Sequence, residues 1–562
     1  MKNLVFFFHA HLPFVKHPES NFDGRDNYQE VWFYEAVLEV YLPMLYVIEK
    51  LDKRHGKNKI KFNINFSPTI IDMLVNPYFK ERFDKYLENT ENLAKEELAR
   101  TDNLDNFYGC FRDRLGEQYE QSVNERLFNI SLTANTFYKR VMFFKDYYLK
   151  NNKDIIGIIK RLVTNGNLEL VAQLGTHPLS PMIVNPRYID FQIKAGIERL
   201  KSVFNITPHG IWLPEQAFSN ILPDLLIQNG IEYTIIEPIS IKDIYHKDID
   251  YFFKDKNGLA YFLRDVEKTD KVWDRSKGYP CNGLYKEFYR DAGWDWRFEL
   301  ISPYLYDISL DQEHTTRHQL SIRYYRITDL EVPLSNKDFY NRWSAVKQAK
   351  KDAIDFAQNF DVKNDNAVIL AFDAELFGHW WFEGCDWVYF TVSEMMKNGD
   401  FNLMFLNEYY SKQINKAPII NPAISAWGKA GNMNDWCNKI THDCWLKIQN
   451  TMDLIDELID DKFHIDTPKF IFELMLREVL LLQSSDFPFL VFTNGSVKYA
   501  KYRIDRHYMR LMGLINQIKT RDIDFKWAEN IYKEDDIFAD IDLISIFEKS
   551  LEINNKKYVL QI

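Results

Sequence analysis

The stretch Val368-Ile-Leu-Ala-Phe-Asp-Ala-Glu-Leu-Phe-Gly-His-Trp-Trp-Phe-Glu-Gly384 joins an apolar run to a dense aromatic cluster, with Asp373 at the junction. A short apolar run of this kind is typical of a buried strand, so we expect Asp373 at a strand end. A second run, Gly210 to Leu213, is followed in the same way by Glu215. One acid from each of two strand ends is what cleavage of a glycosidic bond requires, so this pair indicates a sugar-cleaving site.

Short apolar runs recur along the chain to about residue 390 and alternate with amphipathic stretches. This alternation favours an α/β architecture with parallel strands. Several runs end in polar side chains, which is typical of the active-site rim of a barrel. The runs are Leu4 to Phe8, Ile60 to Phe66, Leu168 to Ala172, Gly210 to Leu213, Tyr233 to Ile236, Ala260 to Phe262 and Val368 to Phe372.

Two regions depart from this alternation. Between about 76 and 150 the sequence is charged and has helical periodicity, which predicts a helical insertion. After about residue 400 the pattern is again helical, as in Asp443 to Asp460 and Pro468 to Gln483. We therefore predict a catalytic barrel over residues 1–395, containing the insertion, and a C-terminal α-helical domain over 396–562. The chain has no Gly/Ser linker, so we expect the parts to pack tightly.

The bulk composition narrows the possible partners. The chain has 562 residues, 70 basic and 81 acidic side chains and a net charge of −11, and it has no continuous basic stripe. These features argue against nucleic acid as a partner. Aromatic residues make up 15% of the chain, and their ring faces suit the apolar faces of sugars.

The cysteines and the N-terminus bear on location. Five scattered cysteines, an odd number, fit a reduced cytoplasm better than a disulfide framework. The run Leu4 to Phe8 is too short for a signal peptide and is followed by His9 and His11. We expect a cytoplasmic protein without a membrane span, because we find no stretch of about 18 apolar residues.

Five stretches, in this order, resemble glycoside hydrolase family 57, and more closely its 1,4-α-glucan branching-enzyme branch. The resemblance covers most of the chain, and the ordered set is far more specific than any single motif. The stretches are His9-Ala-His-Leu-Pro-Phe14; Asn167-Leu-Glu-Leu-Val171 with Thr176-His-Pro178; Trp212-Leu-Pro-Glu-Gln-Ala-Phe218; Phe372 to Gly384; and Leu482-Gln-Ser-Ser-Asp-Phe-Pro-Phe489.

The resemblance implies an incomplete seven-stranded (β/α) barrel, an inserted helical domain and a C-terminal helical domain that closes the cleft. It also implies a retaining mechanism on α-1,4-linked glucans, with Glu215 as nucleophile and Asp373 as general acid/base. Retaining carboxylates lie about 5 to 5.5 Å apart, and here Glu215 should be ionised while Asp373 carries a proton. No metal and no cofactor are implied.

The same resemblance assigns sugar-binding roles to side chains around the two acids. Three histidines match positions that line the subsite for the transferred sugar, and tryptophans match aromatic positions of the cleft. His379 and Trp380 are expected to pack around Asp373 rather than to touch the reacting bond. The full predicted set is His9, His11, Trp32, His177, Trp212, Trp273, His379, Trp380, Trp427, Trp436 and Asp486.

Three alternatives stay open at this point. In the branching members the lid is longer than Glu237 to Asp250, where Tyr245 is the only aromatic residue. A short lid favours hydrolysis, as in an α-amylase, over transfer to a sugar. A 4-α-glucanotransferase of the same family is a related alternative. Histidines two apart with a nearby acid also suit a divalent metal, as in metal-dependent carbohydrate hydrolases and deacetylases. The third alternative is a glucan-binding protein without turnover.

Overall fold

A ring of parallel strands forms the centre of the molecule. The computed structural model describes residues 2–17, 29–111, 122–241, 252–305, 317–360, 367–397 and 399–553. The strands of the ring are, in order, β1 (Lys2–Ala10), β2 (Phe62–Phe66), β3 (Leu168–Leu170) continued by β4 (Ala172–Gln173), β5 (Gly210–Trp212), β6 (Tyr233–Ile236), β8 (Ala260–Leu263) and β9 (Ala367–Asp373).

Two irregular joints complete this ring. Between β3 and β4, the amide of Val171 donates to the carbonyl oxygen of Ile64 at 3.0 Å, so the two short strands act as one. Between β8 and β9, Arg264 and Ile369 form a single parallel bridge. The backbone amide of Asp265 donates to the carbonyl oxygen of Ile369 at 2.9 Å. The seven parallel positions with one weak closure confirm the predicted incomplete barrel.

Two short strands extend the ring at its edges. β7 (Phe252–Lys254) pairs antiparallel with β8, and β10 (Phe401–Leu403) pairs parallel with the first residues of β1. Since β10 follows residue 395 and still pairs with β1, the chain keeps contact with the barrel beyond the predicted end of the catalytic part. The division into residues 1–395 and 396–562 stays a prediction.

Helices cover the outside of the barrel, and several begin with the same local device. Ser67, Asn76 and Asn185 each accept a hydrogen bond from the first helical turn, with proline at the next position. A capping oxygen followed by proline fixes a helix start, because proline lacks the amide that would stay unpaired there. The covering helices are α1 (Gln29–Ala36), α2 (Leu42–His55), α3 (Pro68–Val75), α7 (Ile155–Thr164), α8 (Pro186–Phe204), α9 (Leu222–Gln228), α10 (Val266–Trp273), α13 (Arg342–Gln358), α14 (Gly384–Met395) and α15 (Leu406–Gln413).

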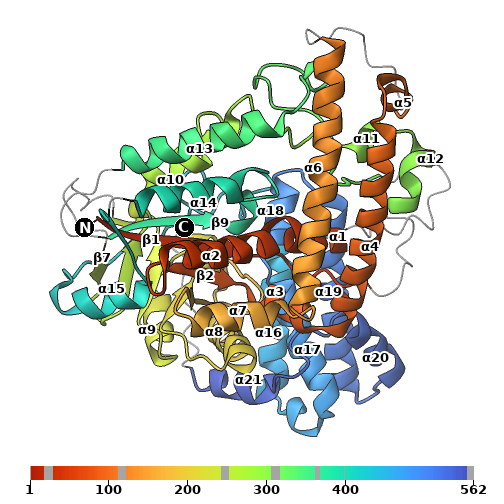
Figure 1. The fold of residues 1–562 in the computed structure, drawn as a ribbon. Coiled ribbons are helices and arrows are strands. Elements are labelled where there is room, and N and C mark those ends of the chain that lie inside the picture. Colours follow the sequence, from red (N-terminus) through yellow and green to blue (C-terminus); the bar gives the residue numbers. More distant parts are fainter. Residues whose placement is uncertain are drawn as a thin grey trace.

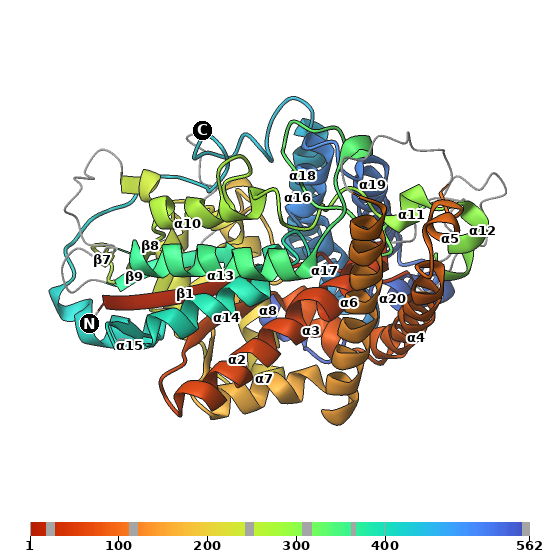
Figure 2. The ribbon, with the colours of Figure 1, turned by 45° about the horizontal axis from the view of Figure 1, so that its top comes forward.

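The predicted helical insertion consists of α4 (Pro77–Arg100), α5 (Leu104–Tyr108) and α6 (Val123–Lys150). Figure 1 shows α4 and α6 side by side, on the opposite side of the molecule from β7, and Figure 2 shows the same separation. The insertion shares a small core with a second excursion that contains α11 (Ala292–Asp295) and α12 (Phe298–Ile301). Trp296 and Tyr324 of this excursion both donate to the buried Glu97 of α4.

The C-terminal part is helical, as predicted, and it shares one continuous hydrophobic core with the barrel. Its central helix α19 (Val497–Thr520) contacts three others, and α21 (Leu543–Leu551) packs on α8 of the barrel. The remaining helices are α16 (His442–Asp460), α17 (Lys469–Leu482), α18 (Asp486–Phe492) and α20 (Phe525–Glu534). The shared core agrees with the expected tight packing.

One continuous helical segment bears on the expectation about apolar stretches. In residues Gln29–His55, α1, the π-helical turn η1 (Val37–Tyr41) and α2 form one helix. Its most apolar 18-residue stretch has a mean hydropathy of 1.4, so by length and composition alone this helix could cross a membrane. However, 89% of that 18-residue stretch is buried within the protein. Contact with the rest of the fold therefore accounts for the apolar side chains.

The close packing of α8 on the barrel gives a stability prediction. A Cβ atom at Gly196 would lie 1.7 Å from the carbonyl oxygen of Gln173 in β4. We expect Gly196→Ala to lower the free energy of unfolding by about 3 kcal/mol, because helix and strand must separate. Denaturant unfolding measures this change. Glu198→Ala, at an exposed site on the same helix, should change it by less than about 0.5 kcal/mol; equal effects of the two substitutions would contradict the predicted contact.

Candidate active site

The two predicted acids lie at the same rim of the barrel. Asp373 is the last residue of β9 and is the register partner of His9 in β1. His177 follows β4 and Glu215 follows β5, which are neighbouring strands. Parallel strands present their C-terminal ends to one face of a barrel, so all four residues face the same mouth.

Two segments from outside the ring dock against this rim. The backbone amide of Ser485, just before α18, donates to the carbonyl oxygen of His177 at 2.9 Å. The backbone amide of Trp427 donates to the carbonyl oxygen of Glu215 at 3.0 Å. A bridge between Pro178 and Ser484 supports the first contact.

The backbone at these docking points is strained. His177 and Glu215 both have φ of 59°, and Gln216 has φ of 46°. A side chain with a Cβ atom rarely adopts this left-handed conformation, and such residues concentrate at functional sites whose surroundings hold them in place. The hydrogen bonds from Trp427 and Ser485 supply that hold.

The same two residues also contact the Glu215 carboxylate. Trp427 donates its indole Nε1–H to Oε2 at 2.7 Å, and the Ser485 hydroxyl donates to Oε1 at 3.3 Å. Ser485 in turn lies 2.8 Å from Nδ1 of His177. Burial raises the pKa of Glu215 to about 7, and the Asp486 charge adds to this rise, while the Trp427 and Ser485 hydrogen bonds and the nearby His11 oppose it. Donors from outside the barrel therefore favour the ionised form of Glu215.

Asp373 has the opposite environment. Burial, and then the negative charges of Glu375 and Glu215, raise its pKa well above the usual range, and only Arg264 opposes them. Among the described residues, none donates a hydrogen bond to its carboxyl group. Asp373 therefore retains a proton more readily than Glu215 does, which is the division of roles expected for acid and nucleophile. The expected separation of about 5 to 5.5 Å stays a prediction.

The three predicted histidines form one stacked group. His11 lies on His177 with ring centroids 3.7 Å apart and planes at 6°, and His9 Nε2 lies 3.2 Å from His177 Nε2. Asn65 uses its amide N–H groups on two backbone carbonyls, so its Oδ1 accepts from His9 Nδ1 at 2.8 Å. Burial, and then neighbouring imidazoles, keep the pKa of both His9 and His177 well below the usual value. Both rings are therefore kept in the neutral form.

The metal alternative can be tested on this geometry. Ligand atoms of His11, His177 and Asp486 lie within 4.8 Å of one another. However, both nitrogens of His177 already contact other side chains, His9 and Ser485, and His11 Nε2 lies 3.0 Å from Asp486. The residues present do not fit a metal-ligand set.

The predicted tryptophans divide into two groups. Trp427 lies beside Trp212 and Trp273, with centroid distances of 5.4 and 5.6 Å, so these three gather at Glu215. Trp212 is fully buried and stacks on Phe7 and His9, and it therefore has no surface left for a sugar. Trp273 is partly buried and keeps an accessible surface.

The other predicted binding residues contact other parts of the fold. Trp32 contacts Tyr499 of α19 edge-on at 5.9 Å, and the buried Trp436 stacks on Phe489 at 5.8 Å. His379 places Nδ1 2.5 Å from Glu39 Oε2. Trp380 is 46% exposed, and its backbone amide donates to the carbonyl oxygen of Glu375.

Several functional contacts were not predicted from sequence. Ser485 lay within a quoted motif, but only Asp486 was singled out there, and Trp427 was expected to stack on sugar, not to donate to Glu215. Asn65 gave no signal, because it lies inside an apolar strand. The predicted lid, Glu237 to Asp250 with Tyr245, falls mostly outside the described residues; Glu237 itself forms a bidentate pair with Arg264.

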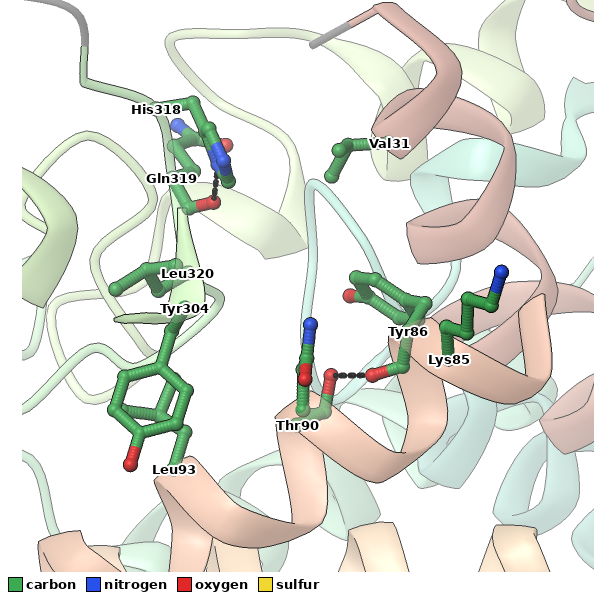
Figure 3. A pocket seen from close by; sticks show the side chains of 10 residues that line it. Val31, Lys85, Tyr86, Thr90, Leu93, Tyr304, His318, Gln319 and Leu320 are labelled. Carbon is green, nitrogen blue, oxygen red and sulfur yellow. Dashed lines mark hydrogen bonds between the residues drawn. The ribbon is translucent and has the colours of Figure 1, made fainter. Parts of the chain in front are cut away.

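A separate cavity lies between α4 and residues 317–320, as Figure 3 shows. Tyr86 and Thr90 of α4 line one side, and His318 and Leu320 line the other. Its volume of about 40 Å³ holds only one or a few water molecules, so it is no site for a sugar ring. Neither Glu215 nor Asp373 lines it.

Comparison with known proteins agrees with this geometry. The chain is 25% identical to the 1,4-alpha-glucan branching enzyme of Thermococcus kodakarensis, over 96% of this chain and 77% of that protein. The structure of the alpha-amylase AmyC from Thermotoga maritima matches with a TM-score of 0.79 and 26% identity, over 97% of this chain and 99% of AmyC. A branching enzyme of glycoside hydrolase family 57 from Pyrococcus horikoshii matches in fold with a TM-score of 0.78 and 23% identity, over 100% and 99% of the two chains.

Two family models match the chain in separate regions. The model described as 1,4-alpha-glucan branching enzyme, C-terminal, matches residues 447–545, which hold Ser485 and Asp486. The model described as glycosyl hydrolase family 57 matches residues 5–421, which hold both acids. Because this second match covers well over half of the sequence, the chain belongs to glycosyl hydrolase family 57.

Proposed function

We propose that this protein is a retaining 1,4-α-glucan branching enzyme, which cuts an α-1,4 link and transfers the released segment to a 6-hydroxyl. The observation that carries the proposal is the pair of partly buried acids at one barrel rim. Glu215 accepts two hydrogen bonds, while Asp373 accepts none among the described residues and carries the stronger tendency to hold a proton. This asymmetry suits a nucleophile and a general acid.

The reaction then proceeds in two balanced steps. In the first, a Glu215 carboxylate oxygen bonds to the anomeric carbon, and Asp373 gives its proton to the departing 4-oxygen. In the second, Asp373 removes the proton of the acceptor hydroxyl, whose oxygen bonds to the anomeric carbon and displaces Glu215. Double displacement retains the α configuration. The stacked histidine group and Trp273 are the proposed contacts to the transferred sugar.

The C-terminal helices support transfer to a sugar acceptor. The C-terminal branching-enzyme model matches residues 447–545, and this region supplies Ser485 to Glu215 and Asp486 to His11. Closure of the mouth by a second domain excludes water, which favours a sugar hydroxyl as acceptor. The similarity to an alpha-amylase makes hydrolysis by the same two acids the alternative outcome. A cytoplasmic location stays a prediction.

Product analysis on amylose tests the proposal. Purified protein is incubated with amylose, and new α-1,6 linkages are measured against new reducing ends. Branching should give α-1,6 linkages with few net reducing ends, since each cut end is transferred. Reducing ends without α-1,6 linkages would establish hydrolysis, longer unbranched chains would establish 4-α-glucan transfer, and no turnover with retained binding would establish a glucan-binding protein.

Replacement of either acid should remove the activity. We expect Asp373→Asn to lower kcat by about 10²- to 10⁴-fold, because the leaving oxygen loses its proton donor. Glu215→Gln should lower kcat by at least about 10³-fold, because no covalent intermediate forms. Glu169→Gln is the matched control. Burial raises the pKa of this carboxyl to about 7 as well, but its hydrogen bonds come from Tyr233 and the amide of Asn407 and not from the donors of Glu215. Activity retained in either acid variant would contradict the assigned roles.

Trp427 should set the acidic limb of the pH profile. Trp427→Phe removes the donor to Glu215 Oε2, so the carboxylate becomes less stable and its pKa rises above about 7. The acidic limb of kcat/KM should therefore move to higher pH, by about half to one unit. The same substitution at Trp343, which is 65% exposed on α13, should leave the limb in place. An unmoved limb in Trp427→Phe would mean that this hydrogen bond does not control Glu215.

A further inference from the structure

The loop that follows Asp373 is held from the side by a helix with an unusual turn. α1 and α2 are joined without interruption by η1, a π-helical turn over Val37–Tyr41. Single π-helical turns inside α-helices are rare and frequently lie at functional sites. η1 contacts the short turn Ala374–Leu376 directly after Asp373.

Two side chains of η1 bind this loop at two points. The Tyr41 hydroxyl donates to Glu375 Oε1 at 2.6 Å, and Glu39 Oε2 lies 2.5 Å from His379 Nδ1. The backbone amide of His11 also donates to Glu375 Oε1, at 3.3 Å. Glu375 is thereby fixed between η1 and the chain just after β1.

The backbone of the loop is fitted to the same turn. Gly378 has φ of +119°, and a Cβ atom there would lie 2.1 Å from the carbonyl oxygen of Glu39. That carbonyl also accepts from Arg140 Nη2 of α6 at 3.0 Å. Only glycine permits this approach and this φ together, so the loop and the π-helical turn have a single way to fit.

We propose that η1 is the positioning element of the acid/base: Tyr41 and Glu39 fix the loop after Asp373, and Tyr41 holds the Glu375 carboxylate of that loop in place. Tyr41 and Glu375 are positioning residues, since they act through Asp373 and touch no substrate. The inference rests on the proposed function of Asp373 as general acid and assigns the residues that make it one.

The charges around Asp373 agree with this role. Glu375 from its own loop and Glu215 from the end of β5 are the negative groups that raise its pKa, and Arg264 from the end of β8 is the positive group that lowers it. Around Glu375, burial raises the pKa to about 7, while the Tyr41 hydrogen bond, the His11 charge and the His11 amide lower it. Tyr41 therefore favours a negative Glu375, and a negative Glu375 favours a protonated Asp373.

The test is the pH profile of kcat/KM, whose basic limb reports loss of the Asp373 proton. Glu375→Gln removes the neighbouring negative charge, so the limb should move to lower pH by about half to one unit. Tyr41→Phe leaves Glu375 neutral more often and should move the limb in the same direction, with kcat lowered by about tenfold and KM changed by less than about twofold. The double variant should move it no further than Glu375→Gln alone, because Tyr41 acts through Glu375.

Tyr147→Phe is the matched control, because it removes a tyrosine–glutamate hydrogen bond, to Glu49, on helices away from the barrel rim. It should leave the limb in place, and thermal unfolding of all variants confirms that they are folded. Unmoved limbs in both single variants, additive shifts in the double variant, or an equal shift in Tyr147→Phe would overturn the inference while the proposed function stands. A folded wild-type protein inactive on every α-glucan would overturn the proposed function and this inference together.

Discussion

The hydrogen bond from Trp427 to Glu215 is the contact on which the site depends most. A carboxylate withdrawn from water is costly to ionise unless donors replace the lost hydration. Trp427 and Ser485 supply those donors, and they lie 212 and 270 residues beyond Glu215 in the chain. The barrel alone therefore holds the acid, while the docking of later segments supplies the donors that the proposed nucleophile needs.

The same docking accounts for the strained backbone at the rim. His177 and Glu215 adopt left-handed conformations, and each has its carbonyl oxygen bound by the amide of a docked residue. Strain of this kind persists only where the surroundings determine the conformation more strongly than the residue itself does. The C-terminal helices thus contribute to backbone geometry as well as to side-chain contacts, in agreement with their core being continuous with that of the barrel.

A family fold does not by itself fix the reaction. An alpha-amylase and a branching enzyme match this structure almost equally well, so the fold alone does not distinguish hydrolysis from transfer. The difference lies in which acceptor reaches the covalent intermediate. In this chain the features that bear on it are the C-terminal region with Ser485 and Asp486, and the tuning of Asp373 by Glu375.

Part of this protein could be predicted from its sequence. Apolar runs gave the strands, because burial of a parallel strand on both faces requires consecutive apolar residues. Acids and histidines directly after those runs were correctly placed at one rim, since parallel strands end on the same face. The helical insertion and C-terminal helices followed from their periodicity. Gln29–His55 was not singled out as a membrane-length segment, because Glu35 and Glu39 interrupt its apolar residues and no continuous apolar run results.

Only the tertiary structure decided which side chains meet. Trp212 and Trp427 were both predicted to bind sugar, yet one is buried on Phe7 and His9 and the other donates to Glu215. Tyr41 and Glu39 carry no local signal of their link to the loop after Asp373. The physical reason is that periodicity and capping reflect the few residues of one turn or strand. Contacts between residues hundreds of positions apart, and the burial that sets the pKa values of the acids, exist only once the chain has closed around them.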